Sequence, residues 1–247
     1  MAQQAFTDAQ AAFYNASFEK AADLAGDLCA ADDLDACELR TTALLMEIKR
    51  ATGNSKDKDQ AFRACAKCRA LFEAFLRDTT RGQAEAHARL KANPSDEAAQ
   101  FLLGKLDLNY VWLQLGTLGR KTGWDEYWEA RHTLDAILKR NPHNVRAKVA
   151  RAWIDYIVDT RMPRGTRWVL GGGNKKRAIA ALREAAKAET DVYTSAEARF
   201  GLWDVLVREK NIPEAVALAR ELARDFPANT DLPKFLEEHE RDSKSCD

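Results

Sequence analysis

Apolar residues recur at helical spacing along almost the whole chain, with interruptions at short polar stretches. Between the interruptions they return every three or four positions, and no segment alternates apolar and polar residues as a half-buried strand does. The interruptions at 93–95, 141–144 and 226–229 contain asparagine, proline or serine, which are residue types that end helices or begin new ones. The pattern therefore predicts an all-α fold whose helices are joined by turns, with Asp96 and Asn144 as helix caps.

The same landmarks return along the chain, which indicates internal repeats. Ala130 is followed by an apolar residue, Leu134, and later by Pro142. Ala215 is followed at the same spacing by Ala219 and by a second proline. A small residue lets two helices approach closely, and proline stops a helix before the next one begins. Repeated landmarks of this kind predict helical hairpins that stack side by side.

These repeats resemble the tetratricopeptide repeat family, whose unit of about 34 residues joins two antiparallel helices. Leu103 and Gly104 stand where that family carries Leu-Gly in the first helix of a repeat. The resemblance implies an α-α superhelix: one domain over residues 1–247, a stack of helix hairpins that is clearest at about 94–227, and a capping helix at about 231–241.

The small residues Gly82, Ala130 and Ala178 are spaced more widely than one repeat of this family. We expect the surplus residues to form a stretched helix over 97–119 and a long loop over 161–173. The longest apolar run, 106–119, lies in the expected stretched helix and contains one acid, Asp107. That run is too short for a membrane span, which needs roughly 18 apolar residues or more.

The resemblance also implies a concave groove lined by one face of the first helix of each repeat. Most of the positions that fall on this face are apolar, which is unusual for a surface in water. Two alternatives are open: the groove binds an apolar ligand or a peptide, or the stretched helices fill it. The predicted binding residues, with one member of the aromatic cluster below, are Phe101, Lys105, Leu108, Asn109, Trp112, Arg146, Val149, Trp153, Tyr156 and Phe200.

The loop over 161–173 is the most unusual segment, because turns within such repeats are short. It contains Arg161, Arg164, Arg167 and Trp168 and ends in three glycines before a basic helix start. One hypothesis is a binding role, in which backbone N–H groups at the helix start hold an anion. The alternative is a structural loop in which Trp168 fills an apolar gap and the arginines pair with acids.

An aromatic cluster follows the stretched helix and comprises Tyr110, Trp112, Trp124, Tyr127 and Trp128. It either packs between repeats or lines a pocket for a flat apolar molecule. Just after it, Glu129 and His132 form one Glu-x-x-His unit, whereas a carboxylate-bridged metal site needs two such units. We therefore expect no metal, no cofactor and no enzymatic activity.

Four of the five cysteines form two close pairs, Cys29 with Cys37 and Cys65 with Cys68, and Cys246 stands apart. Close pairs favour disulfides and an oxidising compartment. The alternatives are reduced cysteines that fill helix faces, or a zinc site, for which the wider spacing of the first pair is unusual. Cys65 and Cys68 are expected inside a helix, which speaks against a thioredoxin-like redox motif.

The chain begins Met1-Ala2-Gln3-Gln4, without the charged and apolar regions of a signal peptide. We therefore expect either a cytoplasmic protein or a periplasmic or secreted chain without its signal peptide, and the cysteine pairs favour the second. Lys plus Arg and Asp plus Glu both number 38, and this balance argues against a nucleic-acid partner. The predicted function is binding of a protein or peptide in the groove. The alternative is a periplasmic carrier of an apolar small molecule or lipid, accessory to a transport system.

Overall fold

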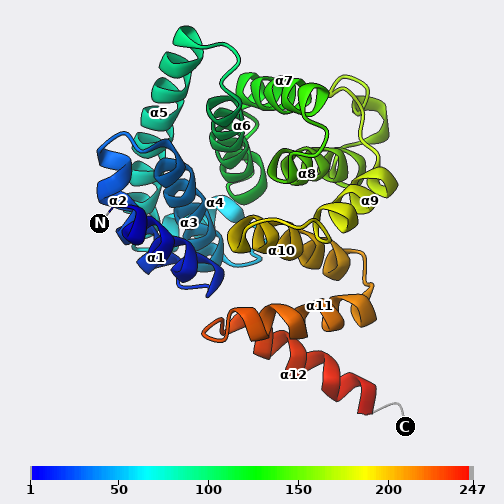
Figure 1. Ribbon diagram of the computed structural model, residues 1–247. Helices are drawn as coiled ribbons and strands as arrows, with labels where there is room; N and C mark the ends of the chain where they lie inside the picture. Colours follow the sequence, from blue (N-terminus) through cyan, green and yellow to red (C-terminus); the bar gives the residue numbers. More distant parts are fainter. Residues whose placement is uncertain (1, 245–247) are drawn as a thin grey trace. The chain divides into compact units, whose positions relative to one another are not determined.

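A computed structural model describes residues 2–244, which form twelve α-helices and no strand (Figure 1). The prediction of an all-α fold is confirmed. The helices are α1 (Ala2–Tyr14), α2 (Phe18–Ala30), α3 (Leu34–Thr52), α4 (Lys58–Ala64), α5 (Cys68–Ala92), α6 (Glu97–Val111), α7 (Trp124–Arg140), α8 (Val145–Arg161), α9 (Lys175–Ala185), α10 (Val192–Arg208), α11 (Ile212–Asp225) and α12 (Asp231–Lys244). The chain divides into two compact units, Met1–Phe13 with Ser17–Ile137, and Tyr14–Ala16 with Leu138–Asp247. We call these unit 1 and unit 2.

Polar side chains begin many of the helices as the sequence predicts. The Asp96 carboxylate accepts a hydrogen bond from the Ala99 N–H at 3.0 Å, and the Asn144 side chain accepts one from the Ala147 N–H at 2.9 Å. Each bond satisfies one of the N–H groups that the first turn of a helix leaves without a partner. Both predicted caps are confirmed. The same arrangement begins other helices at Asp33, Asp57, Asn174 and Asp191.

In unit 1, α3 packs against α2, α5 and α6, and α5 also packs against α6. Gly82 of α5 lies where these helices come closest. A Cβ atom added at this glycine would lie 2.7 Å from Leu106 Cδ1 and 3.2 Å from Cys37 Cβ. Gly104 lies at a similar approach of α6 to α7, where an added Cβ would lie 2.9 Å from Thr133 Oγ1. At both glycines the missing side chain leaves the space that side chains of the neighbouring helices fill.

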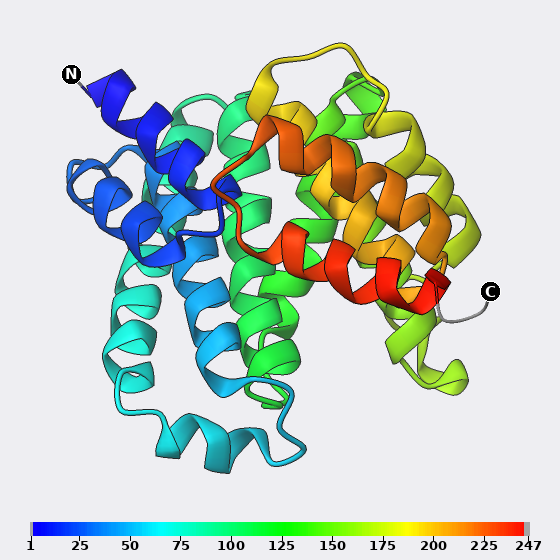
Figure 2. The same cartoon turned by 90° about the horizontal axis from the view of Figure 1, so that it is seen from below.

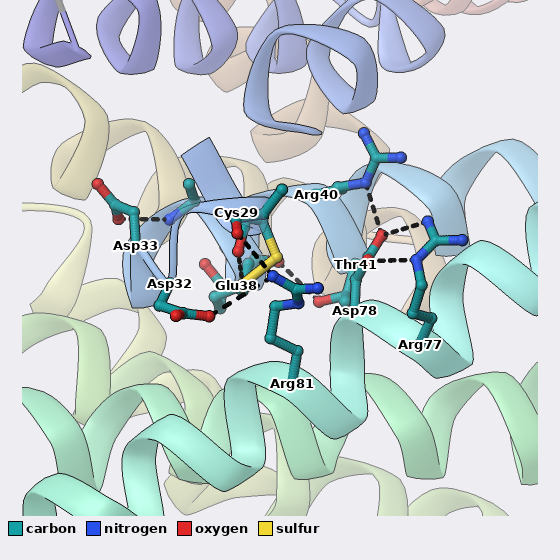
Figure 3. Close-up of a disulfide and its surroundings, with 12 residues drawn as sticks. Cys29, Asp32, Asp33, Glu38, Arg40, Thr41, Arg77, Asp78 and Arg81 are labelled. Carbon is teal, nitrogen blue, oxygen red and sulfur yellow. Dashed lines mark hydrogen bonds and ion pairs between the residues drawn. A yellow bond between two sulfur atoms is a disulfide. The ribbon is translucent and has the colours of Figure 1, made fainter. Parts of the chain in front are cut away.

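The sulfur atoms of Cys29 and Cys37 lie at disulfide distance, 2.04 Å, and join the end of α2 to the start of α3 (Figure 3). Beside this bond, α5 carries the buried carboxylate of Asp78. Its oxygens accept hydrogen bonds from Arg40 Nε of α3 at 2.7 Å and from Arg77 Nε at 3.1 Å. A covalent bond and a buried ion pair therefore hold the α2–α3 hairpin together and against α5.

The second cysteine pair, Cys65 and Cys68, also lies at disulfide distance, 2.11 Å. Cys65 follows the last residue of α4, and Cys68 is the first residue of α5. The prediction that both cysteines lie inside one helix is therefore wrong: the chain turns between them, and α4 connects α3 to α5 (cyan in Figure 2). Cys246 lies outside the described residues.

In unit 2, α8 packs against α9 and α10, α10 packs against α9 and α11, and α11 packs against α12. The last two helices run side by side in orange and red in Figure 2. The small residues Ala178 and Ala215, which the repeat pattern singles out, are buried where the helices meet. The predicted last helix is confirmed and begins at Asp231.

The two segments with surplus residues differ in structure. The predicted stretched helix is α6 extended by one π-helix, Trp112–Thr117, so it continues almost as far as expected. The predicted long loop joins α8 to α9 and contains one short 3₁₀ helix, Arg164–Thr166. No helix within residues 2–244 is both long enough and apolar enough to cross a membrane.

Candidate functional site

In unit 2, two residues of the predicted groove on α8, Arg146 and Trp153, contact the neighbouring helix α10. Arg146 of α8 donates a hydrogen bond from Nε to Glu197 Oε2 of α10 at 2.9 Å. Further along the same pair, the guanidinium of Arg208 lies 5.7 Å from the ring centre of Trp153. Arg146 and Trp153 are predicted groove residues, and each contacts a residue of α10, so both lie beside the same neighbouring helix.

Trp153 is the aromatic centre of this surface. Its ring is half-buried and meets Tyr156 edge to face, with ring centres 5.7 Å apart. Gly201 of α10 faces it, and an added Cβ at this glycine would lie 3.2 Å from Trp153 Nε1. Val149, one turn before Trp153, is only 3 % exposed. We call Arg146, Trp153, Glu197, Asp204 and Arg208 the α8–α10 face.

Tyr156 extends from this aromatic pair into a hydrogen-bonded group. Its hydroxyl donates to Glu209 Oε1 at 2.9 Å, and Lys175 Nζ donates to Glu209 Oε2 at 2.6 Å. Burial alone would raise the pKa of Glu209, but the bonds from Lys175 and Tyr156 outweigh it and lower the pKa. Burial, and then the bond to Glu209, raise the pKa of Tyr156 to about 12. This group therefore holds a neutral tyrosine against an ionised carboxylate at neutral pH.

Phe200, predicted to lie in the groove, belongs to another aromatic group of unit 2. Its ring centre lies 5.6 Å from that of Tyr14 and 5.8 Å from that of Phe226. Trp203, one turn later in the chain, meets Phe200 edge to face. Phe200 therefore contributes to the core around the start of α12, and the structure does not bring it to Trp153.

In unit 1, the apolar members of the predicted groove are largely buried. Phe101 is 4 % exposed and Leu108 is 3 % exposed. Tyr110 and Trp112, both partly buried, pack against a core cluster that contains Phe75. These side chains offer little surface to a partner, and their role in binding stays a prediction.

The polar members of the predicted groove in unit 1 bind residues of α3. Asn109 Nδ2 donates to the hydroxyls of Thr41 at 3.0 Å and Thr42 at 2.8 Å. Lys105 Nζ lies 3.6 Å from Glu38 Oε1. These contacts of Lys105 and Asn109 join α6 to α3.

The loop between α8 and α9 is held by a single carboxylate at the end of α8. Asp159 pairs with the guanidinium of Arg167 and accepts the backbone N–H of Lys175, the first residue of α9, at 2.8 Å. Arg167 Nε also donates to the Met162 carbonyl at 3.1 Å, and the Gly172 N–H donates to the Arg167 carbonyl at 2.8 Å. The sequence suggested an anion at this helix start, and Asp159 of the chain itself occupies that position.

The tip of this loop is turned outward. Trp168 is 78 % exposed and Val169 is 51 % exposed, whereas Leu170 is buried. Arg161 and Arg164 are also exposed. The alternative in which Trp168 fills an apolar gap is therefore wrong, because the buried anchor of the loop is the neighbouring Leu170.

The remaining aromatic residues of the predicted cluster lie on α7. Tyr127 and Trp128 meet edge to face with ring centres 5.4 Å apart, and Trp128 stacks on His132 at 5.6 Å. Trp124 is 42 % exposed. The stacking of His132 on Trp128 gives the Glu-x-x-His motif a packing role. Among the residues that the structure describes, no three His, Cys, Asp or Glu side chains are placed to hold a metal ion.

Asp107 of α6 is a notable residue that the sequence analysis did not single out as a site. It is fully buried, its Oδ1 accepts a hydrogen bond from Gln83 Nε2 at 2.8 Å, and its Oδ2 has no hydrogen-bond partner. Burial raises the pKa of Asp107 to about 8: the bond from Gln83 opposes this effect, and the charges of Glu129 and Glu126 add to it. The one available signal was an acid inside the longest apolar run.

A comparison of the sequence with protein-family models and with curated proteins finds no match.

Proposed function

We propose that the chain is a non-enzymatic binding module, similar to tetratricopeptide repeat proteins, that holds a protein or peptide partner against the α8–α10 face. The observation that carries the proposal is the alignment of Arg146 with Glu197 and of Trp153 with Arg208 on two neighbouring helices. Aromatic and arginine side chains are enriched among the residues that dominate binding energy at protein interfaces.

The side chains of this face are suited to bind a peptide that carries both an apolar and an acidic side chain. The partly exposed ring of Trp153 provides apolar area at low entropic cost, because a tryptophan side chain has few rotatable bonds. Arg208 lies above that ring and binds the carboxylate of Asp204, one turn earlier in α10, since its Nε donates to Asp204 Oδ1 at 2.9 Å. A partner carboxylate that replaces Asp204 would bind the same guanidinium without disturbing the ring.

The experiment is selection of peptides from a displayed library on the folded chain, followed by calorimetric measurement of affinity for single variants. Trp153→Ala and Arg208→Ala should each weaken binding of the selected peptides about tenfold or more, as expected for central interface residues. Trp124→Ala is the matched control, because Trp124 is also partly exposed but lies in unit 1. Circular dichroism checks that each variant is folded.

Two results would contradict the proposal. One is a selection that yields no peptide with measurable affinity. The other is a set of peptides whose affinity for Arg208→Ala and Trp153→Ala equals that for the unchanged chain. Arg208→Ala keeps the experiment decisive if the larger Trp153 substitution unfolds the protein.

The second candidate function is carriage of an apolar small molecule or lipid, as an accessory to a transport system. The sequence favours it, because most predicted groove positions are apolar and a carrier encloses its cargo among apolar side chains; in the structure Phe101 and Val149 are buried. Mass spectrometry of an organic extract of the purified protein tests this candidate. A stoichiometric lipid or other apolar compound would favour the carrier over the peptide-binding module.

Two cysteine pairs at disulfide distance support a further part of the proposal, namely that the protein works in the periplasm or outside the cell. Disulfides persist in oxidising compartments and are rare in the cytosol. Thiol counting on the denatured, unreduced protein should find no more than one free thiol per chain. Five free thiols would contradict this location and favour the cytoplasm.

A further inference from the structure

Residues 160–177 comprise the end of α8, the loop after it and the start of α9. This segment contains six basic residues and no acidic one, in a chain whose formal net charge is zero. Its positive field is therefore local, and an attraction to an anionic surface would act through this segment rather than through the whole molecule.

Half of these cations are already paired inside unit 2. Arg167 pairs with Asp159, Lys175 with Glu209 at 2.6 Å, and Arg177 with Asp155 at 2.7 Å. The other three, Arg161, Arg164 and Lys176, are exposed and make no ion pair with any described acidic residue. The segment thus leaves three positive charges directed to solvent.

Beside these charges stands the most exposed large apolar side chain of the described residues, Trp168, followed by Val169. The next residue, Leu170, is buried and anchors the loop. The exposed tip therefore lies directly beside a side chain that is fixed in the core. Exposed tryptophan costs free energy in water, and its amphipathic ring is enriched at the boundary between lipid headgroups and acyl chains.

Several backbone N–H groups around the tip of the loop donate to carbonyls of the loop itself. The Thr166 N–H donates to the Pro163 carbonyl, that of Val169 to Thr166, that of Leu170 to Arg167, and that of Gly171 to Trp168. Each N–H group that is paired internally lowers the cost of moving the tip into a region poor in water. The clamp of Asp159 on Arg167 and on the start of α9 also means that little order has to be gained on binding.

We propose that this loop docks the protein on a membrane surface that contains anionic phospholipid. Trp168 and Val169 enter the headgroup boundary, while Arg161, Arg164 and Lys176 bind lipid phosphates. The inference goes beyond the proposed function, because it uses none of the residues of the α8–α10 face.

An acidic protein partner would meet the same charges, but the loop is better suited to a lipid surface. Its apolar side chains project at a tip, where the N–H groups of Val169, Leu170 and Gly171 already donate to carbonyls of the loop, so few backbone donors are left for a peptide. A bilayer needs no such donors. Tryptophan beside cationic side chains is the combination that anchors proteins at anionic interfaces.

Flotation with lipid vesicles tests the proposal with the full chain. Vesicles of phosphatidylcholine and phosphatidylglycerol in equal amounts should carry the protein to the top of the gradient, and vesicles of phosphatidylcholine alone should not. Each anionic contact contributes about fivefold in partitioning, so Arg161→Ala, Arg164→Ala and Lys176→Ala together should reduce it about a hundredfold. Trp168→Ala should reduce it about tenfold, and Trp168→Phe should retain most of it.

A matched control removes three exposed lysines of unit 1 instead, Lys20→Ala, Lys56→Ala and Lys91→Ala, which changes the net charge by the same amount. This variant should bind vesicles as the unchanged chain does. Failure of the unchanged chain to bind anionic vesicles would overturn the proposal, as would full binding by Trp168→Ala or equal loss in the control. Binding of poly-glutamate with no binding of vesicles would assign the surface to an acidic protein instead.

Discussion

Two buried aspartates, Asp155 of unit 2 and Asp107 of unit 1, lie in opposite surroundings. Asp155 of α8, 5 % exposed, is bound by Arg151 Nη1 at 2.6 Å and by Arg177 Nη2 at 2.7 Å. Asp107 of α6, fully buried, receives one bond from the neutral Gln83 and has no cation bound to it. Arginines surround Asp155, as they surround the buried Asp78 of unit 1, whereas the charged groups nearest Asp107 are the acids Glu129 and Glu126.

The difference shows that burial alone does not decide whether a carboxyl group is charged in the folded protein or how it affects stability. A charge removed from water needs either an opposite charge or a proton. Arginines supply the first for Asp155. Asp107 takes the second, and its pKa rises to about 8 because burial opposes the charged form and Glu129 and Glu126 add repulsion. The same type of side chain is therefore an ion-pair acceptor at Asp155 and a neutral acid at physiological pH at Asp107.

Asp107→Asn should produce the largest change in the free energy of unfolding. Asparagine does not titrate, so the variant no longer has a buried acid that must be protonated. Because the pKa of Asp107 rises from 3.8 to about 8 on folding, the folded state binds the proton more tightly. The stability from this group is complete below pH 4 and is lost as the pH rises through 8. The variant should therefore gain up to about 5 kcal/mol over the unchanged protein at high pH.

Urea unfolding of both proteins at several pH values measures this gain, and hydrogen exchange in α6 assigns it to unit 1. The difference between the two proteins should be small at acidic pH and should widen toward alkaline pH. A difference that does not vary with pH would show that Asp107 is ionised in the folded protein.

The same substitution in unit 2, Asp155→Asn, should have the opposite sign. It removes the buried carboxylate that binds Arg151, whose side chain is 11 % exposed, and should cost about 3 kcal/mol. Asp204→Asn is the control, because it removes the more exposed partner of Arg208 and should cost less than about 1 kcal/mol. Thermal unfolding measures both, and equal losses would mean that the burial of Asp155 adds nothing.

Gly173→Ala perturbs the backbone of α8 beside Asp155. It should destabilise the protein by about 2 kcal/mol, a smaller effect than that of Asp107→Asn or Asp155→Asn. The added Cβ would lie 2.6 Å from the Asp155 carbonyl and 2.7 Å from the Asp159 N–H nitrogen, so α8 has to shift at Asp155. Gly165→Ala in the same loop meets nothing within 4 Å and should be nearly neutral. Hydrogen exchange in α8 that is equal in the two variants would contradict this account.

Much of the fold could be predicted because its signals are local. Asp96 and Asn144 cap helices wherever a polar side chain precedes a helical run. The glycine landmark of the repeats, Gly82, lies at a close helix crossing. The turn between Cys65 and Cys68 was missed, because a short helix followed by one turn has nearly the same apolar spacing as a continuous helix.

The candidate site was predictable only in part. The repeat register placed Arg146 and Trp153 on one face, and the structure aligns them with Glu197 and Arg208. The same register placed Phe200 with them, although its ring packs on Tyr14, which is far away in the sequence. A register says which side of a helix a residue occupies, but not which distant segment covers that side.

The sequence by itself determined the helices, their caps and the small residues at their crossings, because these depend on neighbours a few positions away. Only the tertiary structure decided the charge of Asp107, the exposure of Trp168 and the presence of Asp159 at the start of α9. Each of these depends on which groups from distant parts of the chain replace water around a side chain. That replacement sets the electrostatic and apolar surroundings from which the functions proposed above arise.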